Sequence, residues 1–120
     1  MPKNPYYKPE HFGLELTSVD QHNMSYEYNT LCFWATKDGR VFTAQDSGCS
    51  CPTPFENYEG KTQKDVLQKL EQVGSVDQAE RTFDAWNDGI YSKQNRCSQS
   101  EREEIIAWVK SHLTSEETSI

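Results

Sequence analysis

A run of alternating residues from Tyr26 to Ala35 constrains the fold of this chain more than any other feature. Large side chains stand at every second position of the run: Tyr26, Tyr28, Thr30, Cys32 and Trp34. A period of two residues predicts a β-strand. The positions between them are apolar as well, with Leu31, Phe33 and Ala35. We therefore expect other parts of the protein to cover both faces of this strand.

The Asp38-Gly39 pair lies between this strand and a second apolar run at 41–44. Asp-Gly is the preferred pair for a two-residue type I′ turn, because both positions of that turn need a positive φ. The expected pairs of the resulting hairpin are Lys37 with Arg40, Ala35 with Phe42, and Trp34 with Thr43. One face would carry Phe33, Ala35, Phe42 and Ala44, and the other Cys32, Trp34, Val41 and Thr43. A shorter alternation at 13–19 predicts a third strand.

The second half of the chain predicts three helices. Each begins at a serine or threonine that precedes, by three residues, a side chain able to complete a cap: Thr62 with Asp65, Ser75 with Gln78, and Ser100 with Glu103. Apolar residues follow at helical spacing: Val66, Leu67, Leu70 and Val73; then Val76, Ala79, Phe83 and Trp86; then Ile105, Ile106, Val109 and Leu113. Strands followed by helices predict an α+β fold. About three antiparallel strands from the N-terminal half would be packed by about three helices from the C-terminal half.

The length of 120 residues fits a single domain with one core. Aromatic residues make up 12 % of the chain and compensate for an apolar content of 34 %, because each buries a large area. We expect five segments: an extended lead-in at 1–11, strands at 12–45, a cysteine- and proline-rich loop at 46–61, helices at 62–113 and an acidic tail at 114–120.

The charge of the chain excludes some classes of partner. Twelve Lys and Arg against nineteen Asp and Glu give a net charge of −7. Proteins that bind nucleic acid usually carry a basic cluster, and this sequence has none. It also lacks an apolar run long enough to cross a membrane, and its N-terminus does not have the apolar stretch of a signal peptide. We expect a cytoplasmic protein with neither a nucleic-acid nor a membrane partner, whose four cysteines are reduced.

The segment from Asp46 to Tyr58 has the most unusual composition, with two cysteines, two prolines, a glycine and two aromatic residues. A zinc site is one interpretation, because cysteine thiolates bind zinc. The candidate ligands are Cys49 and Cys51, completed by Cys32, Cys97, His22 or Asp46. A single residue between the paired cysteines is fewer than the two to four that are common in zinc sites.

Redox chemistry and nucleophilic catalysis are two further interpretations of the same cysteines. The nearby carboxylates of Asp46 and Glu56 disfavour a thiolate. A catalytic cysteine also needs a base, and no motif connects a histidine to this segment. A packing role is favoured, in which the prolines fix the path of the loop while Phe55 and Tyr58 anchor it. We therefore expect no catalytic residue and no cofactor, with zinc as the alternative.

Loop residues and aromatic residues are the candidates for contact with another protein, since tyrosine and tryptophan are enriched at interfaces. The candidates are Asp46, Phe55, Glu56, Tyr58, Trp34 and Trp108. Trp86 falls on the apolar stripe of its helix and is expected in the core. Trp108 falls off the stripe of Ile105 and Val109, which makes it the better candidate for a contact.

Four motifs stand out in the first half: Tyr6-Tyr7-x-Pro9-Glu10-x-Phe12-Gly13-Leu14-Glu15, Ser25-Tyr26-Glu27-Tyr28, Trp34 before Asp38-Gly39, and Asp46-Ser47-Gly48-Cys49-Ser50-Cys51-Pro52-x-Pro54-Phe55-Glu56. Over residues 5–60 the chain resembles a family of small, uncharacterised proteins encoded by bacteriophages of actinobacteria. The resemblance implies a protein of the cytoplasm of an infected host. It implies no activity and no role for a particular residue, beyond the importance of 46–56.

The leading hypothesis is a phage accessory protein that binds a host or phage protein and modulates host physiology or defence, without being an enzyme. It rests on the small acidic domain, the lack of a catalytic constellation and the aromatic residues. Three alternatives are a small zinc-stabilised module, a minor virion component, and a protein that binds or sequesters a small molecule or nucleotide. The last would need cations, for which Arg40 and Arg96 are candidates.

Overall fold

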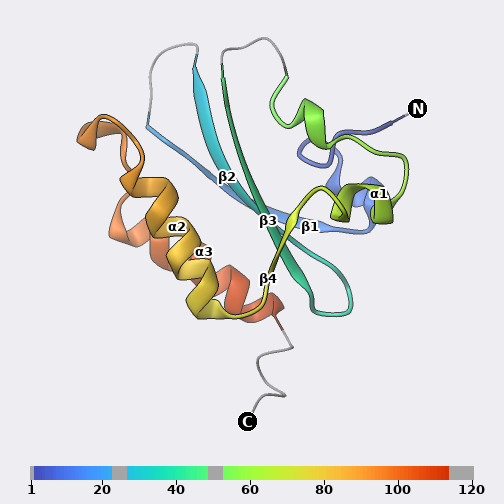
Figure 1. The fold of residues 1–120 in the computed structure, drawn as a ribbon. Helices are drawn as coiled ribbons and strands as arrows, with labels where there is room; N and C mark the ends of the chain where they lie inside the picture. Colours follow the sequence, from blue (N-terminus) through green and yellow to red (C-terminus); the bar gives the residue numbers. More distant parts are fainter. Residues whose placement is uncertain (1, 23–26, 49–52, 114–120) are drawn as a thin grey trace.

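Within the residues that the computed structural model describes (2–22, 27–48 and 53–113), the sheet has four antiparallel strands rather than the three expected. Their order is β1-β2-β3-β4, and they are β1 (Glu15–Asp20), β2 (Tyr28–Ala35), β3 (Val41–Gly48) and β4 (Glu71–Val73). The helices are α1 (Gln63–Leu67), α2 (Val76–Asp88) and α3 (Gln99–His112), with 3₁₀ turns at Pro9–Phe12, Glu56–Tyr58 and Lys93–Asn95. This arrangement confirms the α+β fold (Figure 1).

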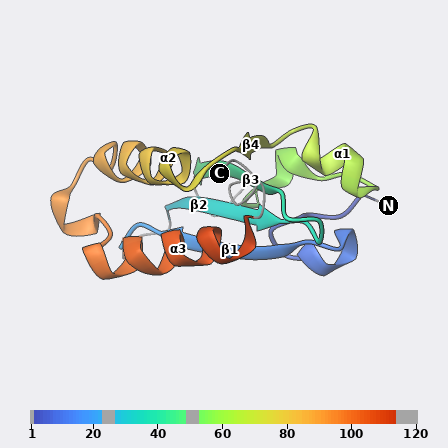
Figure 2. The ribbon, with the colours of Figure 1, turned by 90° about the horizontal axis from the view of Figure 1, so that it is seen from below.

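Both faces of the sheet are covered, as the apolar faces of the central strand predict. On one face α3 runs alongside β1 while α2 lies beside β4 (Figure 2). The helix-side core between them and the sheet includes Val19, Leu31, Phe33, Val41, Val73, Phe83, Trp86, Ile105 and Val109. The N-terminal segment, residues 53–60 and α1 cover the opposite face. The N-terminal-side core there consists of Phe12, Leu14, Cys32, Trp34, Phe55 and Val66.

The hairpin of β2 and β3 has a register that differs by one residue from the predicted one. The observed pairs include Ala35 with Val41, Trp34 with Phe42, Phe33 with Thr43 and Cys32 with Ala44. Since side chains alternate between the faces of a sheet, the shift pairs Phe42 with Trp34 and places it on the face opposite to that of Phe33 and Ala35. The predicted grouping of the two faces was therefore wrong for the four residues of β3 that it covered, at 41–44.

The turn explains this shift. Gly39 has a φ of 89°, but Asp38 does not have a positive φ, so the turn is not of type I′. A three-residue connection forms instead, closed by a hydrogen bond of 2.9 Å from the Thr36 N–H to the Arg40 carbonyl oxygen. The Thr36 hydroxyl oxygen also accepts the Arg40 N–H at 3.0 Å. The side chain of Thr36 thus stabilises the longer connection.

β4 replaces the end of the first predicted helix. That helix was expected over 62–73, but α1 stops at Leu67 and the chain then pairs with the first residues of β3. Val66 lies in the N-terminal-side core and Val73 in the helix-side core. The chain therefore passes around the edge of the sheet between these two valines, which no single helix could do.

The predicted helix caps are present in α1 and α2 and shifted in α3. The bonded partners are Thr62 with Asp65 and Ser75 with Gln78. α3 begins after Ser98, whose side chain accepts the Glu101 N–H, two residues before the predicted cap at Ser100. The Glu101 carboxylate accepts the Ser98 N–H in return, so these two residues form a capping box.

Two boundaries of the predicted segments also change. β3 continues to Gly48, so the first residues of the predicted loop at 46–61 belong to the sheet. Phe12, expected with the strands, lies in a 3₁₀ turn. Cys49 and Cys51, like the tail at 114–120, lie outside the described residues.

Candidate functional site

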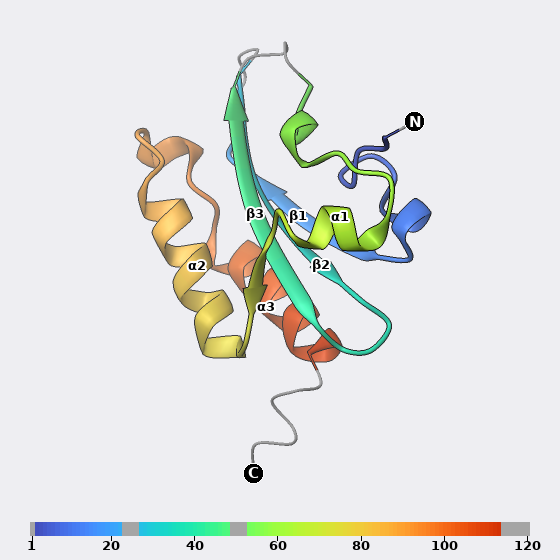
Figure 3. The same ribbon diagram turned by 45° about the vertical axis from the view of Figure 1, so that its right-hand side comes forward.

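The outer edge of β3 is only partly paired. β4 pairs with Val41, Phe42 and Thr43 at the start of β3, and the second half of β3 extends beyond it (Figure 3). The described part of the chain supplies no further strand on this side. Residues 44–48 therefore form a free sheet edge, here called the β3 edge.

The hairpin determines which main-chain groups of the β3 edge point outward. The Thr36 N–H bonds to the Arg40 carbonyl oxygen across the hairpin, and bonded pairs alternate with non-bonded pairs in an antiparallel ladder. Even-numbered residues of β3 therefore bond to β2, and Gln45 and Ser47 point their N–H and C=O groups outward. The Ser47 N–H is accepted by the Asp46 carboxylate at 3.0 Å. The outward main-chain groups of Gln45 have no partner among the described residues.

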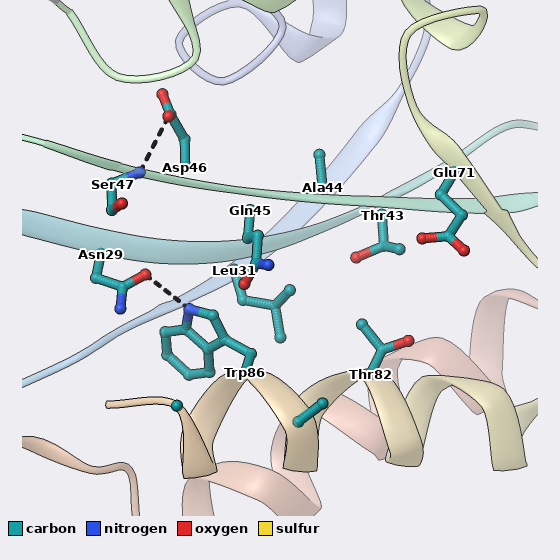
Figure 4. Close-up of a pocket in the computed structure, with 12 residues that line it drawn as sticks. Asn29, Leu31, Thr43, Ala44, Gln45, Asp46, Ser47, Glu71, Thr82 and Trp86 are labelled. Atoms are coloured by element: carbon teal, nitrogen blue, oxygen red, sulfur yellow. Dashed lines mark hydrogen bonds between the residues drawn. The ribbon is translucent and has the colours of Figure 1, made fainter. Parts of the chain in front are cut away.

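A groove of about 690 Å³ lies between the β3 edge and α2 (Figure 4). Its sheet side is mainly polar and consists of Asn29, Leu31, Thr43, Ala44, Gln45, Asp46, Ser47 and Glu71. Small residues dominate its helix side, with Thr82, Ala85 and Gly89 around Trp86. The Trp86 indole N–H donates to the Asn29 side-chain oxygen at 2.8 Å, which fixes the ring between α2 and β2.

Carboxylates are the only charged side chains among the described residues that line this groove. Asp46 points away from α2 (Figure 4) and accepts the Phe55 N–H at 2.7 Å. Glu71 is exposed on β4, opposite Thr43, and lies on the side of the sheet that faces α2. A ligand in the groove would therefore meet the negative charge of Glu71.

Comparison with known proteins identifies the family of this chain. Residues 3–116 match the model of a domain of unknown function, DUF7574. The chain belongs to this family. The DUF7574 match includes the helical half as well as the strands and so reaches beyond the motifs found at 5–60. No curated protein and no solved structure matches the chain.

Two of the six predicted contact residues of this DUF7574 chain are buried and cannot touch a partner. Trp34 and Phe55 are each 0 % exposed, with ring centroids 5.7 Å apart in the N-terminal-side core. The prediction that Trp34 and Phe55 are contact residues was therefore wrong, and their burial has a physical reason. The apolar face of β2 needs cover, and Phe55 turns inward from its loop to supply it.

The other four contact candidates lie on two different faces. Glu56 is exposed, while Asp46 and Tyr58 are half-buried near the N-terminal-side core. Trp108 is half-buried against the helix-side core, and its ring stacks on His112 with centroids 4.0 Å apart. The structure therefore does not bring Trp108 together with the loop residues.

The two cysteines that the structure describes lie in different cores and favour the protonated thiol. Burial, together with nearby carboxylates, raises the pKa of Cys32 far above its ordinary value. Burial, then the carboxylates of Glu101 and Asp20, raises the pKa of Cys97 to about 12. Neither thiol is an activated nucleophile near neutral pH. Cys97 does, however, lie next to His22 and Glu101.

The cations suggested for nucleotide binding are engaged elsewhere. The Arg40 Nε donates to both carboxylate oxygens of Asp38, at 3.0 and 3.1 Å. Arg96 donates to the carbonyl oxygens of Ile90 and Asp88 at 3.1 and 3.2 Å. Neither arginine lines the groove, so no described side chain there offers a charge partner for a phosphate.

Of the six contact candidates named from the sequence, only Asp46 lines the groove, so sequence reasoning missed most of its residues. The strands were predicted to end at residue 45, whereas β3 continues to Gly48 and so includes Ser47. The short length of β4 leaves residues 44–48 without a neighbouring strand among the described residues, and this depends on tertiary pairing. The described helices give no membrane-spanning candidate, because none is both long enough and apolar enough.

Proposed function

We propose that this chain is a non-enzymatic protein-binding module, which takes an extended segment of another protein as an additional strand along the β3 edge. The outward main-chain groups of Gln45, which have no partner among the described residues because β4 ends early, carry this proposal. In this mode of recognition, main-chain hydrogen bonds supply affinity and pockets for alternate side chains supply specificity.

The groove offers room for such a strand. Neighbouring strands lie about 4.8 Å apart, so a segment bonded to the β3 edge would lie in line with β4 and beside α2. Alternate side chains of the segment would point toward Trp86 and the small residues Thr82 and Ala85. These small residues favour a bound side chain of substantial size at that position.

The charge of the groove indicates the chemistry of the segment. Glu71 faces the α2 side of the sheet, Asp46 lies on the strand itself, and the whole chain has a net charge of −7. A segment that contains lysine or arginine would gain from opposite charge and associate faster. The proposed partner is therefore a host or phage protein with an extended basic segment.

The resemblance of residues 5–60 to actinobacteriophage proteins supports a biological setting for this binding. A phage accessory protein in the host cytoplasm would act by occupying a segment of its partner, and thereby modulate host physiology or defence. The buried state of both described thiols agrees with a binding role rather than a catalytic one.

A proline at position 45 tests the proposal. The Gln45 N–H points away from β2, so Gln45→Pro removes an outward donor without breaking the ladder of β2 and β3. Gln45→Ala removes the same side chain and keeps the donor. Random linear peptides are selected on the wild-type protein, and the affinity of the enriched peptides is measured for all three proteins. We expect lysine- or arginine-containing peptides that bind Gln45→Pro at least about tenfold more weakly and Gln45→Ala nearly unchanged.

Two controls make this result specific. The melting temperatures of both variants should agree with the wild type within a few degrees, because the edge is exposed. Amide hydrogen exchange at residue 45 should slow when a selected peptide binds to the wild type. Equal binding to the proline variant, unchanged exchange at the β3 edge, or failure to enrich any peptide would each contradict strand addition.

A further inference from the structure

Three side chains with different metal-binding atoms converge at the end of the sheet where β1 finishes. His22 follows β1, Cys97 lies between α2 and α3, and Glu101 is in the first turn of α3. One ligand atom from each residue lies within 4.8 Å of the others. A nitrogen, a sulfur and an oxygen from three separate segments are thus placed around one point.

The main chain at each of these positions is held in place. The His22 N–H donates to the Asn95 carbonyl oxygen at 2.8 Å. The Cys97 N–H donates to the Asn87 side-chain oxygen, also at 2.8 Å. Glu101 is held by its capping box at the start of α3. The cluster is therefore built on fixed backbone rather than on loosely tethered side chains.

We propose that His22, Cys97 and Glu101 form a zinc-binding site, with water as the fourth ligand. Imidazole, thiolate and carboxylate are the three side-chain ligands that zinc accepts, and zinc commonly takes three of them together with water. Of the six candidate ligands named from the sequence, Cys97 and His22 belong to this site, and Glu101 was not among them. The site is separate from the β3 edge and does not depend on the proposed binding function.

The geometry suits a tetrahedral ion after a small adjustment. Zinc bonds of about 2.0–2.3 Å require ligand atoms roughly 3.3–3.6 Å apart. The His22 Nε2 now lies 2.8 and 3.0 Å from the two Glu101 oxygens, so this pair has to open slightly. The Cys97 thiol donates to the Asp20 carbonyl oxygen at 3.3 Å, so zinc binding breaks this hydrogen bond and releases the thiol proton to solvent.

The surroundings favour a dication and admit water. The side chains of His22 and Glu101 are 57 % and 31 % exposed, so an ion can reach them. A hollow of about 340 Å³ beside them is bordered by Asp20 and Glu104, whose carboxylates add negative charge. An ion there would connect the end of β1 to the start of α3 and stabilise the helix layer against the sheet.

Cobalt substitution tests the site directly, because a thiolate bound to cobalt gives a charge-transfer band in the near ultraviolet. The reduced, chelator-treated protein is titrated with cobalt and then zinc. We expect one ion per chain at this site and a rise in the melting temperature of roughly 10 °C at zinc concentrations 100-fold above Kd. Cys97→Ser should abolish the band of this site, and His22→Ala should weaken binding at least tenfold.

Matched variants separate this site from Cys49 and Cys51 and from a simple ion pair. Cys49→Ser/Cys51→Ser should retain the band. Glu101→Gln keeps the oxygen that caps α3 but removes the negative charge, so it should fold normally and bind zinc at least tenfold more weakly. The proposal is overturned if neither metal binds, or if binding survives Cys97→Ser and is lost in the double variant.

Discussion

Replacing Phe55 with alanine is expected to lower the free energy of unfolding by about 3–5 kcal/mol, the usual range for removing a buried phenylalanine ring. The side chain is 0 % exposed. Its ring centroid lies 5.1 Å from Tyr6, 5.7 Å from Trp34 and 5.5 Å from Tyr58. These contacts connect the N-terminal segment, β2 and the 3₁₀ turn at 56–58, so the truncation would loosen three segments together. Urea denaturation measures the loss.

The backbone of Phe55 provides an internal control. Its φ of 61° lies in the left-handed region, which favours glycine. Phe55→Gly should therefore be at least as stable as Phe55→Ala, whereas glycine is less stable than alanine at most positions. Tyr91 is fully exposed, and Tyr91→Ala should leave the unfolding midpoint unchanged. A Phe55→Ala midpoint as high as that of Tyr91→Ala would show that the ring does not anchor this core.

Replacing Val73 with aspartate is expected to destabilise the protein by about 4 kcal/mol or more, because an unpaired carboxylate would be placed in the helix-side core. Val73 is 0 % exposed and pairs with Val41, which is also 0 % exposed. The loss is measured by urea denaturation or, if the variant does not fold, by its far-ultraviolet circular dichroism.

Two further variants make the result for Val73 interpretable. Val73→Thr keeps the shape of the side chain and adds a hydroxyl, so it should fold with a smaller loss of about 1–3 kcal/mol. Gln72→Asp places the same carboxylate on the neighbouring exposed residue of β4 and should have little effect on the midpoint. Equal effects of aspartate at 72 and 73 would be inconsistent with the burial of Val73.

The fold class and most of the elements could be predicted because their signals are local. The alternation in β2 depends on consecutive residues, and the caps of Thr62 and Ser75 depend on residues three positions apart. The hairpin register depends on which of two turns forms between β2 and β3, and the two turns differ little in stability. The Asp38-Gly39 pair favours a two-residue turn, but the Thr36 hydroxyl oxygen accepts the Arg40 N–H and stabilises a three-residue connection.

β4 could not be predicted from its own residues. Val66, Leu70 and Val73 recur with the period of a helix, and nothing local contradicts that period. Pairing with the start of β3 and burial of Val73 in the opposite core outweigh the helical preference. Tertiary contacts decide such short segments, because a helix this short has little stability of its own.

The candidate sites were hidden for the same reason. The sequence drew attention to cysteines, aromatic residues and Asp46, whereas the rest of the β3 edge consists of small or uncharged polar residues whose main chain is exposed because the neighbouring strand β4 ends early. His22, Cys97 and Glu101 are distant in the sequence, and only the packing of α3 against β1 brings them together. The inward turn of Phe55 likewise follows from the uncovered face of β2.

The N-terminal segment is held by residues that come much later in the chain. The Asn4 side-chain amide donates to the Pro54 carbonyl oxygen at 2.9 Å, and the Trp34 indole N–H donates to the Pro5 carbonyl oxygen at 3.0 Å. Lys3 and Gly60 exchange main-chain hydrogen bonds of 2.8 and 3.1 Å. During synthesis on the ribosome, residues 3–5 therefore cannot reach their final positions before residues 54–60 have been made. Until those residues have emerged, the face of the hairpin that carries Trp34 lacks the cover of Phe55, and such transiently exposed apolar surface is what chaperones bind.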